Sequence, residues 1–450
     1  MLPTTLGTES IGKLLRQFAI PAIIAMTASS LYNMVDSIFI GQGVGTLAIS
    51  GLAVTFPFMN LAAAFGSLVG VGASTMISVK LGQKDYDTAR KVLGNVVSLN
   101  MIIGILFTVI SLLFLDPILY FFGASSNTIS YARDYMIIIL CGNIITHCYL
   151  GLNSAMRSSG MPKQAMAATI LTVVLNAILD PIFIFVFDLG IAGAAYATIL
   201  AQIVSLVWLI ISFSHKDKVM HFTRKGFRLE KRIVFSSLSI GMSPFLMNVA
   251  ACLIVIVINR TLFYHGGDIA IAAYGIINRV VFVIVMIVLG LNQGMQPIAG
   301  YNFGAQNKER VLKVLKMTII YATVITTTGF LICEIFPYYI ARVFTSDENL
   351  ISEAVVGMRY VVMVFPIVGV QMVSSNFFQS IGMARQSIFL SLTRQLIFLL
   401  PGLLIFPLFF GTTGVWISMP LSDLLATIVA LVMLLYYLKK FRNDELIINL

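Results

Sequence analysis

The sequence predicts an all-α integral membrane protein whose twelve transmembrane helices form two pseudo-symmetric six-helix lobes around a central cleft. Three observations lead to this fold class. The chain is 58% hydrophobic and only 11% charged, its mean hydropathy is +0.95, and its second half repeats its first. A soluble domain carries about 25% charged residues, so this composition excludes an ordinary soluble globular protein.

Apolar runs of about 20 residues or more recur along the chain, and each can cross about 30 Å of hydrocarbon as a helix. They are too long and too continuous for the alternating strands of a membrane barrel. We predict spanning helices over residues 14–37, 46–72, 93–114, 132–156, 165–187, 191–213, 234–259, 268–292, 312–335, 354–378, 386–409 and 413–438. The first run contains polar residues and no small-residue cleavage site, so we interpret it as a helix and not as a signal peptide.

The repeat has an offset of about 222 residues. Lys80 to Leu93 (KLGQKDYDTARKVL) aligns with Asn302 to Leu315 (NFGAQNKERVLKVL). Duplication of a very apolar chain is typical of secondary transporters, whose substrate site lies between the halves. An even number of helices in each half gives both halves the same orientation. We therefore expect a parallel repeat, related by an axis along the membrane normal, in which rocking exposes the cleft to either side in turn.

The repeat also predicts the domain organisation. We expect an N-terminal lobe at residues 1–213, a basic cytoplasmic linker at 214–232 and a C-terminal lobe at 233–450. Prolines inside helices favour bends. Pro21 aligns, one residue out of register, with Pro244, and we predict a hinge at Pro21.

The 29 Lys and Arg residues give a formal net charge of +10, and their distribution along the chain is asymmetric. All but six fall at the termini or in the connections after every second predicted helix. The six are Arg133, Arg342 and Arg359, near the opposite side, and Arg260, Arg279 and Arg394, within helices. Cytoplasmic loops are enriched in Lys and Arg, so we predict a multi-pass protein with both termini in the cytoplasm. The short termini and loops favour the bacterial cytoplasmic membrane. The charge then reflects topology and contact with the lipid bilayer, and no nucleic-acid partner is predicted.

The sequence predicts neither an enzyme nor a resident cofactor. It contains no H-E-x-x-H zinc site, no G-x-S-x-G elbow and no Walker A loop. The four cysteines, at positions 141, 148, 252 and 333, lie in apolar segments without metal-ligand spacing, and we interpret them as packing residues.

A carboxylate inside a spanning helix is costly and usually functional. The first predicted helix carries Asp36 about one turn after Tyr32 and Asn33, so the three side chains can share one face. We take Tyr32 and Asn33 as candidate substrate-binding residues.

The fifth predicted helix repeats this pattern with Asn176 and Asp180, four residues apart. The sixth contributes Thr198, and the end of the fourth offers Asn153. Carboxylates with amide and hydroxyl oxygens form a hard-ligand set that suits Na⁺, or a site that holds a proton. For Asn153 and Thr198, a simple hydrogen bond between helices is an equal alternative.

Asp423 lies within the last predicted helix, and the sequence leaves three readings of it open. It could bind a cationic substrate, pair with an internal arginine (Arg260, Arg279 or Arg394), or be a satisfied structural group.

The stretch from Pro21 to Gly41, the LGQKD loop after the second helix and the twelve-helix duplication together resemble the multidrug and toxic compound extrusion (MATE) family over nearly the whole chain. The resemblance implies two six-helix lobes around a central cleft and cation-coupled drug export. It also implies a first-lobe cation site, whose residues here would be Asp36, Asn153, Asn176, Asp180 and Thr198.

The chain departs from one branch of the family, which carries acidic residues in the seventh and eighth helices. It has Asn259 and Arg260 in the seventh and Asn278 and Arg279 in the eighth. We therefore expect cation coupling to rest on the first lobe alone.

Taken together, these features predict an antiporter, active as a monomer, that exports cationic, amphipathic small molecules by alternating access. The coupling ion is H⁺ or Na⁺, held by Asp36 and Asp180, with no other cofactor. The alternative is a flippase for lipid-linked oligosaccharides, which would use the internal arginines to bind pyrophosphate.

Overall fold

The computed structural model describes residues 4–443, apart from the side chains of residues 32–35, 37, 38, 41, 42, 46 and 49. Within these residues the chain forms helices and connecting turns and contains no β-strand. This confirms the predicted all-α fold.

The helices of the first half are α1 (Thr5–Thr8), α2 (Ile11–Gly43), α3 (Thr46–Gly82), α4 (Tyr86–Leu113), α5 (Leu115–Phe121), α6 (Ile129–Cys141), α7 (Asn143–Ser158), α8 (Pro162–Pro181), the π-helical turn η1 (Ile182–Val186), α9 (Gly190–Ser214) and the 3₁₀ turn η2 (Arg224–Phe227). Those of the second half are α10 (Lys231–Gly304), α11 (Lys308–Ile335), α12 (Pro337–Phe344), α13 (Glu348–Val362), α14 (Phe365–Ser380), α15 (Ala384–Leu392), the π-helical turn η3 (Thr393–Leu399), α16 (Leu400–Phe410) and α17 (Thr412–Arg442).

The described helices account for the predicted membrane spans. Nine stretches of helix are long and apolar enough to cross a membrane, and the bent pairs α6–α7 (55°) and α13–α14 (54°) add two more. Helix α10 is 74 residues long and is interrupted at Gly267, where φ is 64° and ψ is −156°. It therefore contains two of the predicted spans, 234–259 and 268–292, and the described chain has twelve, as the sequence predicts.

The duplication is visible in the backbone itself. Helix α4 covers 86–113 and α11 covers 308–335, while α7 covers 143–158 and α14 covers 365–380, so each pair begins and ends at the offset of the repeat. Positive φ angles recur at the same offset in three pairs: Gly45 and Gly267, Lys84 and Gln306, and Gly160 and Gly382.

The turns after α3 and α10 share one construction. Lys84 and Gln306 each adopt a left-handed conformation just past the helix, which stops the helical hydrogen bonding. The next residue then caps the following helix: the side chain of Asp85 accepts from the Thr88 amide, and that of Asn307 accepts from the Arg310 amide. A side-chain cap of this kind contributes about 1 kcal/mol.

The described chain packs as two compact units. The first comprises residues 4–9, 24–245 and 300–306, and the second comprises 10–23, 246–299 and 307–443. Helices α2 and α10 each contribute residues to both units. The lobe boundaries drawn from the sequence repeat, at 213 and 233, stay predictions, as does the hinge at Pro21, through which α2 runs without interruption.

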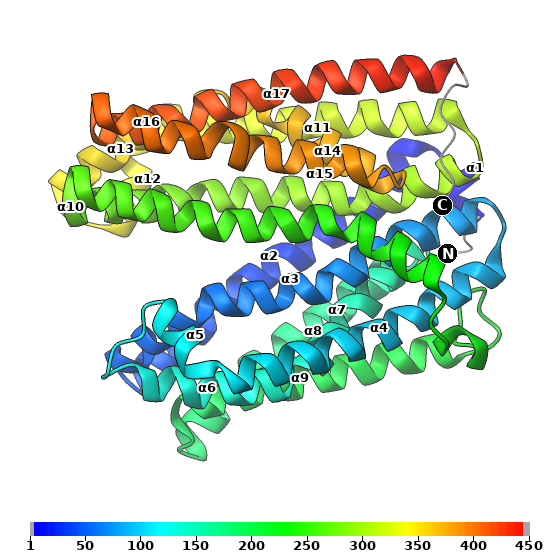
Figure 1. Ribbon diagram of the computed structural model, residues 1–450, viewed down its shortest axis with the longest axis horizontal. Coiled ribbons are helices and arrows are strands. Elements are labelled where there is room, and N and C mark those ends of the chain that lie inside the picture. The colour runs from blue at the N-terminus through cyan, green and yellow to red at the C-terminus, as the bar shows by residue number, and fades with distance from the viewer. Residues whose placement is uncertain (1–3, 444–450) are drawn as a thin grey trace. The chain divides into compact units, whose positions relative to one another are not determined.

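In the first unit, helices α3, α4, α7, α8 and α9 run side by side (Figure 1). Its apolar core gathers side chains from α3, α6 and α9 around the fully buried Met136 and Leu140. In the second unit, α17 packs against α13, α14 and α16. The core there is built around Trp416, which is fully buried and donates its Nε1–H to a carboxylate oxygen of Glu353 at 3.1 Å.

The connection between α9 and α10 is held against α4 by Asn95, which is buried. The Asn95 Nδ2 donates to the carbonyl oxygens of Gly226 (2.8 Å) and Arg228 (3.0 Å), and its Oδ1 accepts from the Glu230 amide (3.1 Å). The Lys91 ammonium lies 2.8 Å from the Glu230 carboxylate. This basic segment is therefore a docked element of the first unit.

Replacing Asn95 by Ala is expected to release this segment. The change leaves two carbonyl oxygens and one amide without their partner, at a cost of about 2 kcal/mol. Limited trypsin digestion of the purified protein should then cut faster after Arg224, Lys225 and Arg228. The matched control is Ser98→Ala, because the Ser98 hydroxyl makes a single bond, to the Phe227 carbonyl oxygen. Equal cleavage rates in the two variants would contradict the role given to Asn95.

Candidate functional site

The two acids of the predicted cation site meet inside the first unit. The side chains of Asp36 of α2 and Asp180 of α8 lie close enough together to interact electrostatically. Both are buried, with exposed fractions of 5% and 0%. A hydrogen bond between two carboxyl groups needs a proton between them, since an ionised carboxylate is only an acceptor. The pair is therefore suited to hold one proton, or a cation in its place.

Asn176 ties this acid pair to a third helix. Its Nδ2 donates to Asp180 Oδ1 and to Thr198 Oγ1, both at 3.2 Å, and Thr198 lies on α9. Asp180 stands on the last turn of α8, immediately before Pro181 and the π-helical turn η1. Such π-helical turns are frequent at functional sites. The structure thus brings together four of the predicted residues, from α2, α8 and α9.

Three oxygen atoms of this cluster have no hydrogen-bond partner in the described part of the chain. They are Asp36 Oδ1, Asn176 Oδ1 and Asp180 Oδ2, and all three are buried. A buried acceptor without a donor costs about 1–3 kcal/mol. Oxygen atoms are the ligands that hard cations prefer, so this arrangement fits a small cation or an additional proton.

The predicted fifth member, Asn153, lies apart from the other four. Its Nδ2 donates to the Ala165 carbonyl oxygen (2.9 Å) and to Thr169 Oγ1 (3.3 Å), near the start of α8. At 1.5 Å per residue, Thr169 is about 10 Å along the helix from Asn176. Asn153 therefore links α7 to α8 by the interhelical hydrogen bond that the sequence left open as an alternative. The side chains of Tyr32 and Asn33 lie outside the described residues.

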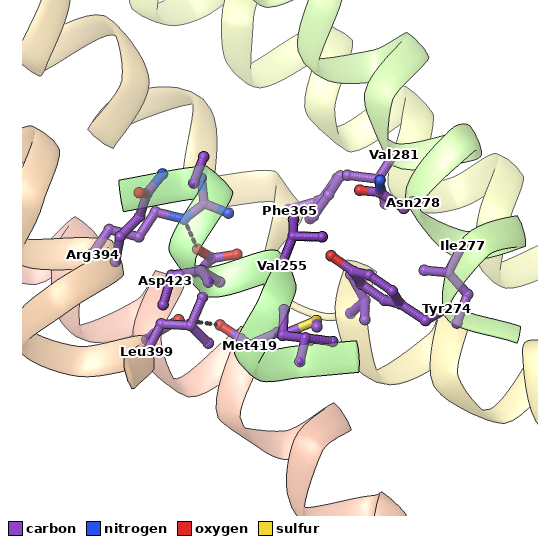
Figure 2. Close-up of a pocket in the computed structure, with 16 residues that line it drawn as sticks. Val255, Tyr274, Ile277, Asn278, Val281, Phe365, Arg394, Leu399, Met419 and Asp423 are labelled. Carbon is purple, nitrogen blue, oxygen red and sulfur yellow. Dashed lines mark hydrogen bonds and ion pairs between the residues drawn. The ribbon is translucent and has the colours of Figure 1, made fainter. Parts of the chain in front are cut away.

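A second polar site lies wholly within the second unit, where Asp423 of α17 faces a cavity of about 190 Å³ (Figure 2). Asp423 Oδ1 accepts from Arg394 Nε at 2.5 Å. Of the three readings of Asp423, the structure thus shows the pairing with an internal arginine, and Arg394 is the one. Because the Arg394 guanidinium already neutralises the Asp423 carboxylate, we do not expect Asp423 to bind a simple cation by charge alone.

The lining of this cavity includes residues that sequence reasoning missed. The Tyr274 hydroxyl and the Asn278 side chain face the same space as Asp423 (Figure 2). The sequence analysis noted Asn278 only as a non-acidic residue of the eighth predicted helix, and no sequence pattern distinguishes Tyr274 from the other polar residues of that helix. Throughout residues 4–443, no group of three or more His, Cys, Asp or Glu side chains is placed to hold a metal ion.

Comparison with known proteins gives one consistent result. The MatE family model matches residues 21–182 and 239–404. The multidrug export protein MepA of Staphylococcus aureus (strain MSSA476) is 30% identical over 430 residues, which cover 96% of this chain and 94% of the relative. The protein of the same name from Staphylococcus haemolyticus (strain JCSC1435) is 29% identical over 423 residues, covering 94% and 93%.

Solved structures agree in fold. A crystal structure of a MATE protein in the bent conformation matches with a TM-score of 0.94 and 24% identity, covering 99% of each chain. An outward-facing multidrug resistance MATE transporter of the MOP superfamily matches with a TM-score of 0.92 and 24% identity, covering 98% of this chain and 99% of its own.

Proposed function

The chain belongs to the MatE family, and we propose from this membership that it exports cationic, amphipathic organic compounds across the bacterial cytoplasmic membrane by antiport with H⁺ or Na⁺. Support for the cargo comes from the relatives, which are multidrug export proteins and which the chain matches along nearly their whole length. Support for the coupling comes from a single observation, the buried Asp36–Asp180 pair.

The acid pair supports coupling because it can exist in two charge states. When a proton or Na⁺ binds, the negative charge of the Asp36–Asp180 cluster is neutralised. Asn176 donates both to Asp180 and to Thr198 of α9, which holds Asp180 in place, so we assign the rearrangement to α2, which carries Asp36. Bending of α2 near Pro21 would then weaken the binding of the exported compound.

Coupling needs a cation that binds the two conformations with different affinities, because equal affinity shifts no equilibrium. In the proposed cycle the cation enters from outside, the compound leaves outward, and the loaded carrier turns inward to release the cation. One charge moving inward through 100 mV gains about 2.3 kcal/mol, which supports a gradient of about fiftyfold.

The proposal also covers the membrane topology and the oligomeric state of the protein. It is a multi-pass membrane protein, and the asymmetric distribution of Lys and Arg supports cytoplasmic termini. The acid pair belongs entirely to the first unit of one chain, which supports a carrier that works as a monomer.

Transport in proteoliposomes tests the proposal. The purified chain is reconstituted, and movement of a fluorescent organic cation is followed under an imposed pH gradient and, separately, an imposed Na⁺ gradient, without ATP. One of the two gradients is expected to drive uphill movement, and that result identifies the ion. If neither gradient drives it, the antiporter proposal fails, and flipping of a labelled lipid pyrophosphate becomes the activity to measure.

A further inference from the structure

We infer that the cavity of the second unit is a binding site for a small zwitterionic aromatic molecule, in which Arg394 receives the carboxylate and Asp423 receives the ammonium group. The inference goes beyond the proposed export function and does not depend on it. It concerns a different unit from the acid pair, and it is tested by binding alone.

The positive half of the site is the Arg394 guanidinium. Only its Nε is engaged with Asp423, while the guanidinium group carries five N–H donors. The Arg394 side chain is 35% exposed and that of Asp423 is 3% exposed, and both line the cavity, so the guanidinium is the more accessible partner. Arg394 belongs to the seven-residue π-helical turn η3, another π-helical segment at a polar site. Free N–H groups of an arginine are well suited to hold a carboxylate.

The negative half combines Asp423 with neutral acceptors. The second Asp423 oxygen and the Tyr274 hydroxyl point into the same space (Figure 2). Gln395, the neighbour of Arg394, also lines the cavity, and its Oε1 is buried without a hydrogen-bond partner in the described chain. A buried acceptor without a donor favours a ligand that brings N–H groups. An ammonium group supplies three such donors.

Charge balance favours a zwitterion over a simple ion. The Arg394–Asp423 pair is neutral as a whole, so a bound cation or anion would leave one uncompensated charge in a largely apolar cavity. A ligand that carries both charges places each beside its opposite and adds none. Electrostatic complementarity of this kind selects the ligand class more than it raises the affinity.

Size and lining define the rest of the ligand. A cavity of about 190 Å³ is smaller than the 300 Å³ or more of a site for a drug-sized molecule. It suits a molecule with one aromatic ring. The remaining wall contains Asn278 and Ser422 but is mostly apolar, with side chains such as Ile254, Ile258, Phe365 and Met419. An aromatic amino acid has this combination of ring, ammonium and carboxylate.

The experiment compares three matched probes: phenylalanine, its methyl ester and N-acetylphenylalanine. They share one ring but carry a zwitterion, a cation and an anion. Binding to the purified full-length chain is measured by isothermal titration calorimetry in detergent micelles. Phenylalanine is expected to bind about tenfold more tightly than either derivative, since each derivative loses one charge-assisted contact. Equal binding of the three probes, or no saturable binding of phenylalanine, overturns the inference.

Variants of the two charged residues distinguish a loss of recognition from a loss of folding, because each variant should bind one of the probes more tightly and the others more weakly. In Arg394→Gln the freed Asp423 carboxylate should now favour the methyl ester, and in Asp423→Asn the freed guanidinium should favour N-acetylphenylalanine. Arg359→Gln is the matched control, since it removes the arginine of another ion pair in the same unit, 3.6 Å from Glu334 and away from the cavity. It should leave the order of the three probes unchanged. An unchanged order in Arg394→Gln would show that the arginine does not receive the carboxylate.

Discussion

Asp180→Asn is expected to uncouple transport from the imposed ion gradient, and Asp36→Asn is expected to do the same. Either change removes a carboxylate that bears one of the three unpartnered oxygens of the cluster, and it prevents the two side chains from sharing a proton. Loss of a charged ligand costs about 2 kcal/mol of binding energy, which corresponds to a drop of about thirtyfold in the apparent affinity for the coupling ion.

The measurement is gradient-driven movement of the organic cation as a function of the driving-ion concentration in proteoliposomes. Asp116→Asn is the matched control in the same unit, because Asp116 is an exposed acid paired with Arg133. The Arg133 guanidinium keeps the pKa of the Asp116 carboxyl below its usual range, so the control also removes a full negative charge at the pH of the assay. Ion dependence that shifts equally in Asp116→Asn and Asp180→Asn would mean that net charge matters, not the buried pair.

The acid pair is the part of the site that the sequence predicts best, for a physical reason. An ionisable group in the middle of an apolar run has no inexpensive structural explanation, so Asp36 and Asp180 stand out without any knowledge of packing. Asn153 does not stand out in this way. Position along a helix tells how deep a side chain lies in the membrane, but not which neighbouring helix it faces, and Asn153 faces Ala165 and Thr169.

Asp423 illustrates the limit of sequence reasoning. Its partner had to be one of three arginines or none, and the choice depends on how η3 packs against α17. A π-helical turn changes which side chains face a neighbouring helix, and no hydropathy pattern marks the turn at Thr393–Leu399. The cavity beside Arg394 could therefore be found only from the structure.

Helix ends were underestimated for a related reason. The second and eighth apolar runs were predicted to end at residues 72 and 292, but α3 continues to Gly82 and α10 to Gly304. Hydropathy records only the part of a helix that hydrocarbon covers, and both helices continue past it into a polar, basic connection. The extended end of α10 contributes to packing, since its residues 300–306 contact the end of α3 in the first unit.

Gly82→Ala and Gly304→Ala are expected to destabilise the protein strongly, although alanine is the better helix former. A Cβ on Gly82 would collide with the Tyr301 carbonyl oxygen, and one on Gly304 would collide with the Val79 carbonyl oxygen. The atoms met are backbone, which cannot rotate away, so the ends of α3 and α10 must separate. Overpacking of this kind costs about 1–3 kcal/mol.

Gly275→Ala provides the control that separates crowding from helix propensity. A Cβ at Gly275 meets nothing within 4 Å, so this variant should be neutral or more stable by up to about 1 kcal/mol. Thermal unfolding followed by size-exclusion chromatography should place Gly82→Ala and Gly304→Ala below the wild type and Gly275→Ala at or above it. The double variant Gly82→Ala with Gly304→Ala should lose less than the sum of the single losses, because one separation of the helix ends relieves both collisions. Strictly additive losses of stability would indicate two independent contacts and would contradict a single shared contact between the ends of α3 and α10.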